Sequence, residues 1–172
     1  MSLVESLSGI ESMGGSFGFQ LATSVVCGAI VGIERQLRGK AIGIRTSILI
    51  CLATQVFMHL STTLTLEDVS IDPTRVLGQI VTGVGFLGAG VILAKGGSIT
   101  GVTSAAVVWM LAAIGSTIGA GRPVEAMTLT LLVVGVLIVV RALESAFKRL
   151  RGGSDEPEDA LSEPEIAARP VE

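Results

Sequence analysis

Five charged side chains lie between two apolar stretches near the N-terminus. The segment GIERQLRGKAIGIRTSIL, residues 32–49, holds Glu34, Arg35, Arg38, Lys40 and Arg45. Glu34 and Arg38 stand four residues apart, the spacing and order at which an acid and a base pair on one face of a helix. Because a carboxylate at the edge of hydrocarbon is costly when it is unpaired, Glu34 is expected to bind Arg38, Arg45 or a ligand. Ion pairing is the favoured interpretation, and a ligand site is the alternative.

A second group of acidic residues could hold a cation. The segment STTLTLEDVSIDPTR, residues 61–75, contains Glu67, Asp68 and Asp72, and Mg²⁺ is often bound by one or two carboxylates while it keeps several waters. A solvated loop is the simpler explanation. Asp72 followed by Pro73 is typical of a helix cap with proline at the first helical position. Asp72 and Arg75 are therefore candidate residues on this side of the protein, and the identity of any metal is left open.

Residues for covalent or acid–base catalysis are scarce. The chain has one histidine, His59, and no tyrosine, whereas a catalytic nucleophile needs a base within reach. We interpret His59 as a polar residue at a membrane interface and expect neither an enzyme nor a cofactor, with Mg²⁺ as the possible exception. Nucleic acid is not among the expected partners.

The composition indicates a membrane protein. Of 172 residues 49% are hydrophobic and only 16% are charged, and the mean hydropathy is +0.73. A transmembrane helix needs about 17 to 25 predominantly apolar residues. Five stretches meet this need, with edges good to about 2 to 4 residues: 17–33, 44–60, 76–93, 102–118 and 124–140. The predicted fold is an all-α membrane protein, a bundle of five transmembrane helices.

The distribution of Lys and Arg predicts the orientation, because these residues concentrate in cytoplasmic loops. With five spans, ten of the twelve basic residues fall on one side, and only Arg75 and Arg122 fall on the other. The N-terminus is therefore predicted outside and the C-terminus inside, and 34–45 becomes a cytoplasmic loop. The predicted organisation is a short external segment (1–16), a transmembrane domain (17–140), a cytoplasmic amphipathic extension of the last helix (141–151) and a disordered acidic tail (152–172).

The third and fourth spans each carry small residues on one face. In the third span these are Gly78, Thr82, Gly85 and Ala89, with Gln79, Gly83 and Gly90 beside them and Ile80, Val84, Leu87 and Val91 opposite. Small residues let a neighbouring helix approach closely, so the third span is predicted to be central and to pack against the fourth. The fifth span has many branched residues and is expected to be peripheral. The linker KGGSITG predicts a tight hairpin, with Thr103 and Ser104 as possible helix caps.

Two further patterns argue against specific sites. Gly83, Gly85 and Gly88 spell G-x-G-x-x-G, but a dinucleotide site also needs a preceding strand within a βαβ unit, so none is predicted. A pore would want polar or acidic residues along the spans. The polar residues there are Gln20, Gln55, Gln79, Thr82, Thr103 and Ser116, and no carboxylate lies in the middle of a span. This weakens the interpretation as a channel.

Three segments, in order, resemble the MgtC/SapB family of bacterial inner-membrane proteins. They are GAIVGIERQLRGKAIGIRTSIL, DPTRVLGQIVTGVGFLGAGVIL and GVTSAAVVWMLAAIGSTIGAG, and together they cover about residues 20–121. The resemblance implies a five-span bundle with an external N-terminus. It also implies a role in adaptation to low magnesium and in virulence, with a membrane protein such as an ion pump or the F-type ATP synthase as a possible partner.

The family pattern assigns residues to three groups. A functional rim for ligand or partner contact would consist of Glu34, Arg35, Arg38, Arg45 and Thr46. Helix packing and a possible ligand path would involve Gln79, Gly83, Gly85, Gly88, Gly90, Thr103 and Trp109. Asp72 and Arg75 are the external candidates, and no residue is assigned to catalysis. Because a short acidic tail follows Arg151, the resemblance is expected to be to the short SapB-like members, which lack a soluble C-terminal domain.

The leading hypothesis is a non-enzymatic, multi-pass protein of the bacterial inner membrane. It would bind a membrane partner or an ion, and thereby modulate ion transport or membrane energetics during magnesium limitation or host stress. The alternative is a transporter or channel for Mg²⁺ or another ion. The small-residue faces would also allow a homo-oligomer within the bilayer.

Overall fold

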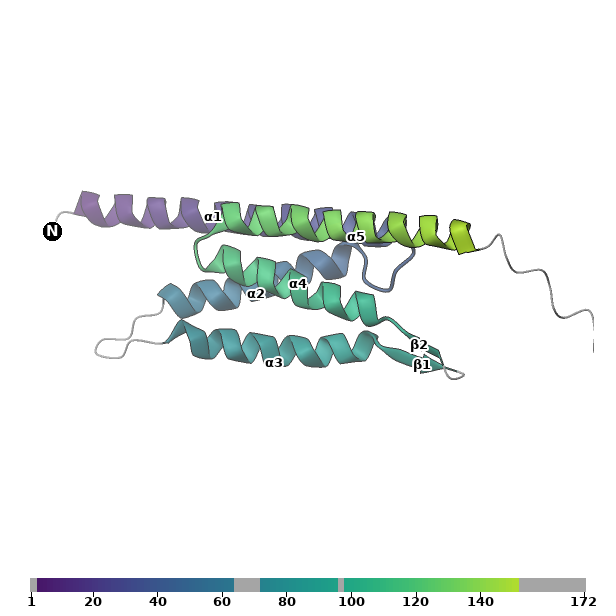
Figure 1. Cartoon of the computed structure of the whole chain (residues 1–172). Coiled ribbons are helices and arrows are strands. Elements are labelled where there is room, and N and C mark those ends of the chain that lie inside the picture. Colours follow the sequence, from purple (N-terminus) through teal and green to yellow (C-terminus); the bar gives the residue numbers. More distant parts are fainter. Residues whose placement is uncertain (1–2, 64–71, 96–97, 152–172) are drawn as a thin grey trace, which may run out of the picture. The chain divides into compact units, whose positions relative to one another are not determined.

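The computed structural model describes residues 3–63, 72–95 and 98–151. Its elements are α1 (Leu3–Leu37), α2 (Ile44–Thr63), α3 (Pro73–Val91), β1 (Leu93–Lys95), β2 (Ser98–Thr100), α4 (Val102–Gly119) and α5 (Pro123–Arg151) (Figure 1). Glu67, Asp68 and the predicted disordered tail lie outside the described residues. The chain divides into two compact units, Met1–Val136 and Leu137–Glu172. The first contains α1 to α4 and the beginning of α5, and the second contains the rest of α5.

Each helix contains a stretch long and apolar enough to cross a membrane. These stretches are Ser16–Leu37, Ile44–Thr63, Pro73–Val91, Val102–Gly119 and Pro123–Phe147. The predicted five-span helical fold is therefore confirmed for the described residues, whereas the orientation of the termini stays a prediction. α1 begins well before the predicted first span, at Leu3. α5 continues to Arg151, so the predicted amphipathic segment 141–151 belongs to the last helix.

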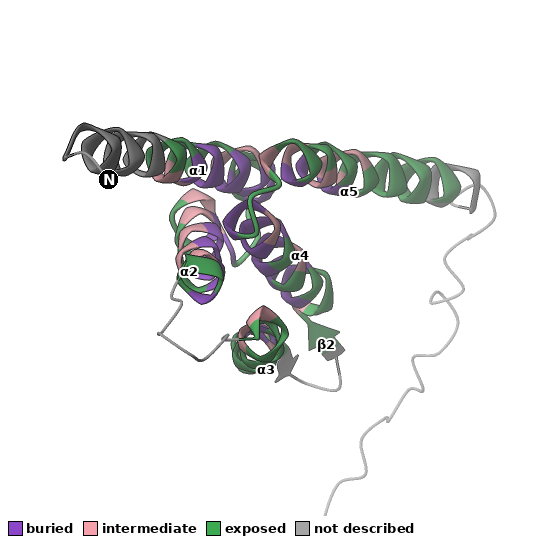
Figure 2. Ribbon diagram, turned by 90° about the vertical axis from the view of Figure 1, so that its left-hand side faces the viewer, coloured by how far each residue is buried: buried purple, intermediate pink, exposed green. Residues whose placement is uncertain are grey.

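The core lies where α1, α2 and α4 meet. α4 contacts all of α1, α2 and α3, and its Leu111, Ile114 and Ile118 are fully buried. Figure 2 shows buried residues along much of α4 and part of α1, whereas α3 is largely exposed. A helix that is apolar all round is typical of the interior of a bundle, and the sequence of α4, VTSAAVVWMLAAIGSTIG, has this character.

Two glycines of α1 let α2 approach closely. A Cβ atom on Gly28 would lie 2.7 Å from the Ile48 Cα, and one on Gly32 would lie 2.6 Å from the Ile44 Cα. Real Cβ atoms do not come this near to backbone. The glycines are four residues apart, as in the G-x-x-x-G motif of membrane helix pairs.

A second pair of glycines in α4 makes the equivalent contact on the other side of α2. A Cβ atom on Gly115 would overlap the Thr54 hydroxyl and the Cys51 carbonyl, and one on Gly119 would overlap the Gln55 carbonyl. This pair also follows the G-x-x-x-G spacing. α2 is therefore held between two helices whose backbones lie directly against it.

α3 is not central, so that prediction is wrong. Only Ile80, Val84 and Gly88 of α3 are buried, and a Cβ atom on Gly78, Gly83 or Gly90 would meet nothing within 4 Å. α3 does pack against α4, as predicted, with Gly85 and Gly88 near Trp109, while the branched Ile80 and Val84, expected on the opposite face, are its buried apolar side chains. Branched side chains make many dispersion contacts against a neighbour, whereas a glycine face helps only where another backbone comes close.

The connection between α3 and α4 is a two-stranded antiparallel hairpin in which Leu93 pairs with Thr100 and Lys95 with Ser98. The predicted hairpin is present, and its arms are short β-strands. Gly101 then caps α4 with a φ of 91°, and no side chain completes the cap. The prediction that Thr103 or Ser104 caps the helix is wrong, because both lie inside its first turn.

Candidate functional site

The last turn of α1 holds an acid and an arginine, and a second arginine follows the helix end. Glu34 is only 8% exposed and pairs with the Nε atom of Arg38 one turn later, which confirms the pair predicted from the spacing. Arg38 itself remains partly exposed. Ion pairing, the favoured of the two interpretations, is therefore present, but both carboxylate oxygens of Glu34 are buried and accept no hydrogen bond from the described residues, so the ligand alternative stays open.

Arg35 points the other way, toward α4. It is 2% exposed, and its Nη2 atom donates a hydrogen bond of 2.7 Å to the Ser104 hydroxyl. The two residues are 69 positions apart, so this bond fixes the end of α1 against the first turn of α4. The Nε atom of Arg35 is buried and has no partner among the described residues.

The turn between α1 and α2 is also ordered by hydrogen bonds. The Gln36 side-chain oxygen accepts from the Ile44 amide at 3.3 Å, and the Lys40 amide donates to the Arg35 carbonyl at 3.1 Å. We call Glu34, Arg35, Arg38, Lys40 and Arg45 the basic end. Lys40 and Arg45 are exposed there.

The structure brings together only part of the predicted rim. Glu34, Arg35 and Arg38 lie side by side, whereas the exposed Arg45 forms no ion pair with Glu34 in the described part of the chain. Thr46 lines a groove instead.

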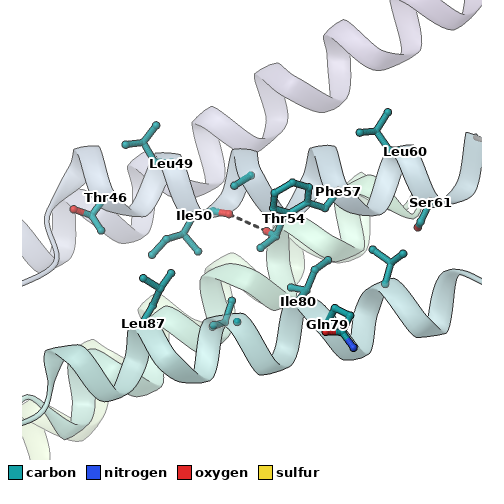
Figure 3. A pocket seen from close by; sticks show the side chains of 14 residues that line it. Thr46, Leu49, Ile50, Thr54, Phe57, Leu60, Ser61, Gln79, Ile80 and Leu87 are labelled. Carbon is teal, nitrogen blue, oxygen red and sulfur yellow. Dashed lines mark hydrogen bonds between the residues drawn. The ribbon is translucent and has the colours of Figure 1, made fainter.

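That groove lies between α2 and α3 and has a volume of about 720 Å³. Its walls are mostly apolar: Leu49, Ile50 and Phe57 of α2 lie opposite Ile80 and Leu87 of α3 (Figure 3).

The residues predicted for a ligand path do not converge on one site. Gln79 and Gly83 line the α2–α3 groove. Gly85 and Gly88 instead lie against Trp109, since a Cβ atom on Gly88 would be 3.6 Å from the Trp109 Cδ1 atom. Gly90 is open to its surroundings, and Thr103 is exposed in the first turn of α4.

Polar residues also lie inside the core formed by α1, α2 and α4. Gln20, Gln55 and Ser116 among them were noted in the sequence, but Ser24 and Ser47 were not. The Gln55 amide nitrogen donates to the Gln20 side-chain oxygen at 3.1 Å. Besides the oxygens of Glu34, buried side-chain oxygens without a partner among the described residues belong to Ser24, Ser47, Gln55 and Ser116. Serine within an apolar span was the available signal, but its position on the buried face depends on how the helices pack.

The external candidates lie at the start of α3. Asp72 accepts hydrogen bonds from the Thr74 amide at 2.9 Å and the Thr74 hydroxyl at 2.7 Å, with Pro73 at the first helical position. Capping, the favoured interpretation of Asp72, is therefore confirmed. These hydrogen bonds, assisted by Arg75, hold the pKa of Asp72 below its ordinary value. The described residues contain no group of three or more His, Cys, Asp or Glu side chains that could hold a metal.

Comparison with known proteins decides the family. The sequence model of the MgtC family matches residues 21–146. The chain belongs to the MgtC family. The resemblance found in the sequence is thereby confirmed, and the match covers the basic end, the α2–α3 groove and the polar core except Gln20.

Named MgtC family relatives come from several bacteria. The Escherichia coli K12 protein "Putative magnesium transporter YhiD" is 47% identical over 106 residues, which are 59% of this chain and 49% of that protein. "Protein MgtC" of Brucella abortus is 35% identical over 143 residues, 82% of this chain and 59% of that protein. The chain thus spans about half the length of the relatives it matches. No solved structure matches it.

Proposed function

We propose that this MgtC family protein is a non-enzymatic, multi-pass protein of the bacterial inner membrane that modulates ion transport or membrane energetics during magnesium limitation or host stress. The observation that carries the proposal is the basic end. At this end Lys40 and Arg45 are exposed. Hydrogen bonds of Arg35 and Gln36 connect the end of α1 to α4 and to the start of α2.

The geometry of the basic end suits contact with a partner. Because Arg35 is tied to Ser104 and Gln36 to the start of α2, the neighbouring Arg38, Lys40 and Arg45 are carried on an ordered frame. Clustered positive charge steers acidic surfaces and favours one docking orientation. An acidic loop of an ion pump or of the ATP synthase is the partner we propose, with the basic end in the cytoplasm.

A second candidate function is ion transport by the protein itself. It is supported by the polar core, since an unpaired polar group in hydrocarbon costs several kcal/mol and the unpartnered oxygens of Ser24, Gln55 and Ser116 could receive water or an ion. The name of the Escherichia coli relative points the same way. Against it, large apolar side chains such as Val31, Leu111 and Ile114 fill the same core.

Exchange of Arg45 for alanine tests the first candidate. Arg45 is exposed, and its side chain makes no hydrogen bond or ion pair with the described residues. Its removal should therefore weaken partner binding without unfolding the protein. We expect slower growth of the variant strain in magnesium-limited medium, measured beside an Arg122→Ala strain. Arg122 is also exposed; it lies between α4 and α5 and pairs with Glu125. Unaltered growth of the Arg45→Ala strain, with normal amounts of protein in the membrane, would contradict a functional basic end.

A flux assay separates the two candidates. Purified protein in liposomes loaded with a metal-sensitive dye should give no more Mg²⁺ entry than empty liposomes if the protein is a modulator. Reproducible entry would favour the transporter.

A further inference from the structure

The N-terminus of α4 is electropositive. The Ala105 amide donates the first hydrogen bond of the helix, to the Gly101 carbonyl at 2.9 Å. The amides of Val102, Thr103 and Ser104 precede it and have no carbonyl within the helix to receive them. Such a helix end carries about half a positive charge. The first turn of α4 contains no acidic residue, and the cap residue is a glycine without a side-chain bond.

A full positive charge lies directly against this helix end. The Arg35 guanidinium contacts the Ser104 hydroxyl at 2.7 Å, although a cation is unfavourable at the N-terminus of a helix. Arg35 is 98% buried, with 2% of its surface exposed, and its Nε–H has no partner among the described residues. The structure therefore places a buried arginine, whose Nε–H has no partner among the described residues, against a side chain in the first turn of α4.

The neighbouring groups do not balance this charge. Glu34 is the acid nearest in sequence, and Arg38 is already paired with it. Together Glu34, Arg35 and Arg38 carry one net positive charge, to which the helix end adds about half of another. The Val91 carbonyl lies against Gly101, but it contributes only a dipole.

From these observations we propose that the first turn of α4, together with Arg35, binds a phosphate group. A phosphate offers several acceptor oxygens to helix amides and an arginine at once. Val102 and Thr103 are exposed, so the amides can be reached from outside. α4 spans 18 apolar residues beginning at Val102, which places its first turn near the depth of lipid headgroups. The phosphate can thus belong to a phospholipid or be a free anion, and the site does not depend on the proposed function.

Thermal unfolding of the purified full-length protein in detergent tests the site. Trp109 is the only tryptophan and lies in α4, so its fluorescence reports on this helix. We expect phosphatidylglycerol to raise the melting temperature saturably, and dioleoylglycerol, which lacks the phosphate, to raise it less. Inorganic phosphate is compared with chloride at equal ionic strength. A response to phosphatidylglycerol alone identifies a lipid headgroup, and a response to both identifies phosphate from either source.

Two variants and two controls locate the response. Thr103→Asp places a carboxylate in the first turn of α4; it should raise the melting temperature without ligand and abolish the shift with ligand. Arg35→Gln should weaken the apparent affinity at least tenfold. If Arg35→Gln does not fold, Thr103→Asp still decides the question. Thr63→Asp, at the exposed end of α2, and Arg122→Gln should respond as the wild type does. A wild-type response in Thr103→Asp, or equal shifts with and without the phosphate group, would overturn the proposal.

Discussion

The arginines of the basic end differ in how far they are removed from solvent, and this separates structural from functional roles. Arg35 is buried and bonded to another helix, so its removal should cost stability, because the Ser104 hydroxyl would lose its partner in the core. Arg45 is exposed, and surface charges contribute about 0 to 1 kcal/mol to stability. A phenotype of an Arg45 variant would therefore report on contact with something outside the chain.

Asp72 gives a pH-dependent prediction at the same scale. Its pKa is lower in the folded protein because it accepts two hydrogen bonds from Thr74. Its contribution to stability is therefore complete above the ordinary pKa of 3.8 and is lost as the pH falls through the lower pKa of the folded state. We expect the wild type to melt at a higher temperature than Asp72→Ala at neutral pH. The gap should close below about pH 3.8 in detergent melting curves.

The matched control is Asp72→Asn, which retains an oxygen to accept from the Thr74 amide and cannot titrate. The gap between Asp72→Asn and Asp72→Ala should stay constant over the same pH range. If the wild-type gap is also constant, the titration of Asp72 does not affect the cap.

Side-chain contacts within one turn could be predicted from the sequence, and contacts between helices could not. The Glu34–Arg38 pair and the Asp72 cap follow from spacings of four and two residues. The bond from Arg35 to Ser104 depends on the packing of α1 against α4, which no local spacing reveals. The family pattern assigns Arg35 to the rim, and nothing in the sequence predicts its burial.

At the scale of helices, close approach depends on where a glycine faces. Lipid tails are as apolar as leucine, so helices associate in membranes through packing and polar contacts. Gly28, Gly32, Gly115 and Gly119 all face α2 and admit its backbone, while Gly78, Gly83 and Gly90 of α3 face open space. The same residue type is therefore indispensable in α1 and α4 and replaceable in much of α3.

Two alanine substitutions test this difference. Gly115→Ala would push a methyl group into the Thr54 hydroxyl and the Cys51 carbonyl, and overpacking of this kind costs about 1 to 3 kcal/mol. Since about 1 kcal/mol shifts the melting temperature by roughly 2 to 4 °C in a chain of this size, a clear decrease is expected. The Cβ atom added by Gly83→Ala would have no neighbour within 4 Å. This variant should leave the melting temperature unchanged or raise it, because alanine favours the helical conformation more than glycine does. Equal decreases in both variants would contradict the packing described for α2 and α4.

The number and limits of the spans followed from hydropathy, but the choice of the central helix did not. Among the predicted spans the third, 76–93, has the most glycines, which favoured it as the centre. The pairs in α1 and α4 have the G-x-x-x-G spacing, which no two glycines of α3 have. Counting small residues was misleading because a close contact needs two glycines at the right spacing on the buried face, and burial is a property of the assembled bundle.

For the whole molecule, the helix contacts fix the relative directions of three helices. The contacts of Gly28 and Gly32 move backward along α2, from Ile48 to Ile44, so α1 and α2 are antiparallel. The contacts of Gly115 and Gly119 advance along α2, so α2 and α4 are parallel. The end of α1 and the beginnings of α2 and α4 consequently share one end of the bundle. The basic end is thus a property of the folded bundle as well as of the sequence.

Reporter fusions test which side of the membrane this end occupies. Translocation of Lys and Arg is disfavoured, so we expect the basic end in the cytoplasm. Green fluorescent protein fused after Arg38 or after Glu172 should fluoresce, and alkaline phosphatase fused after Thr63 or after Gly121 should be active. The paired fusions control for expression, because each site should give one signal and not the other. Phosphatase activity after Arg38 without fluorescence would place the basic end in the periplasm, where it could not meet a cytoplasmic partner, and the proposed function would have to be abandoned.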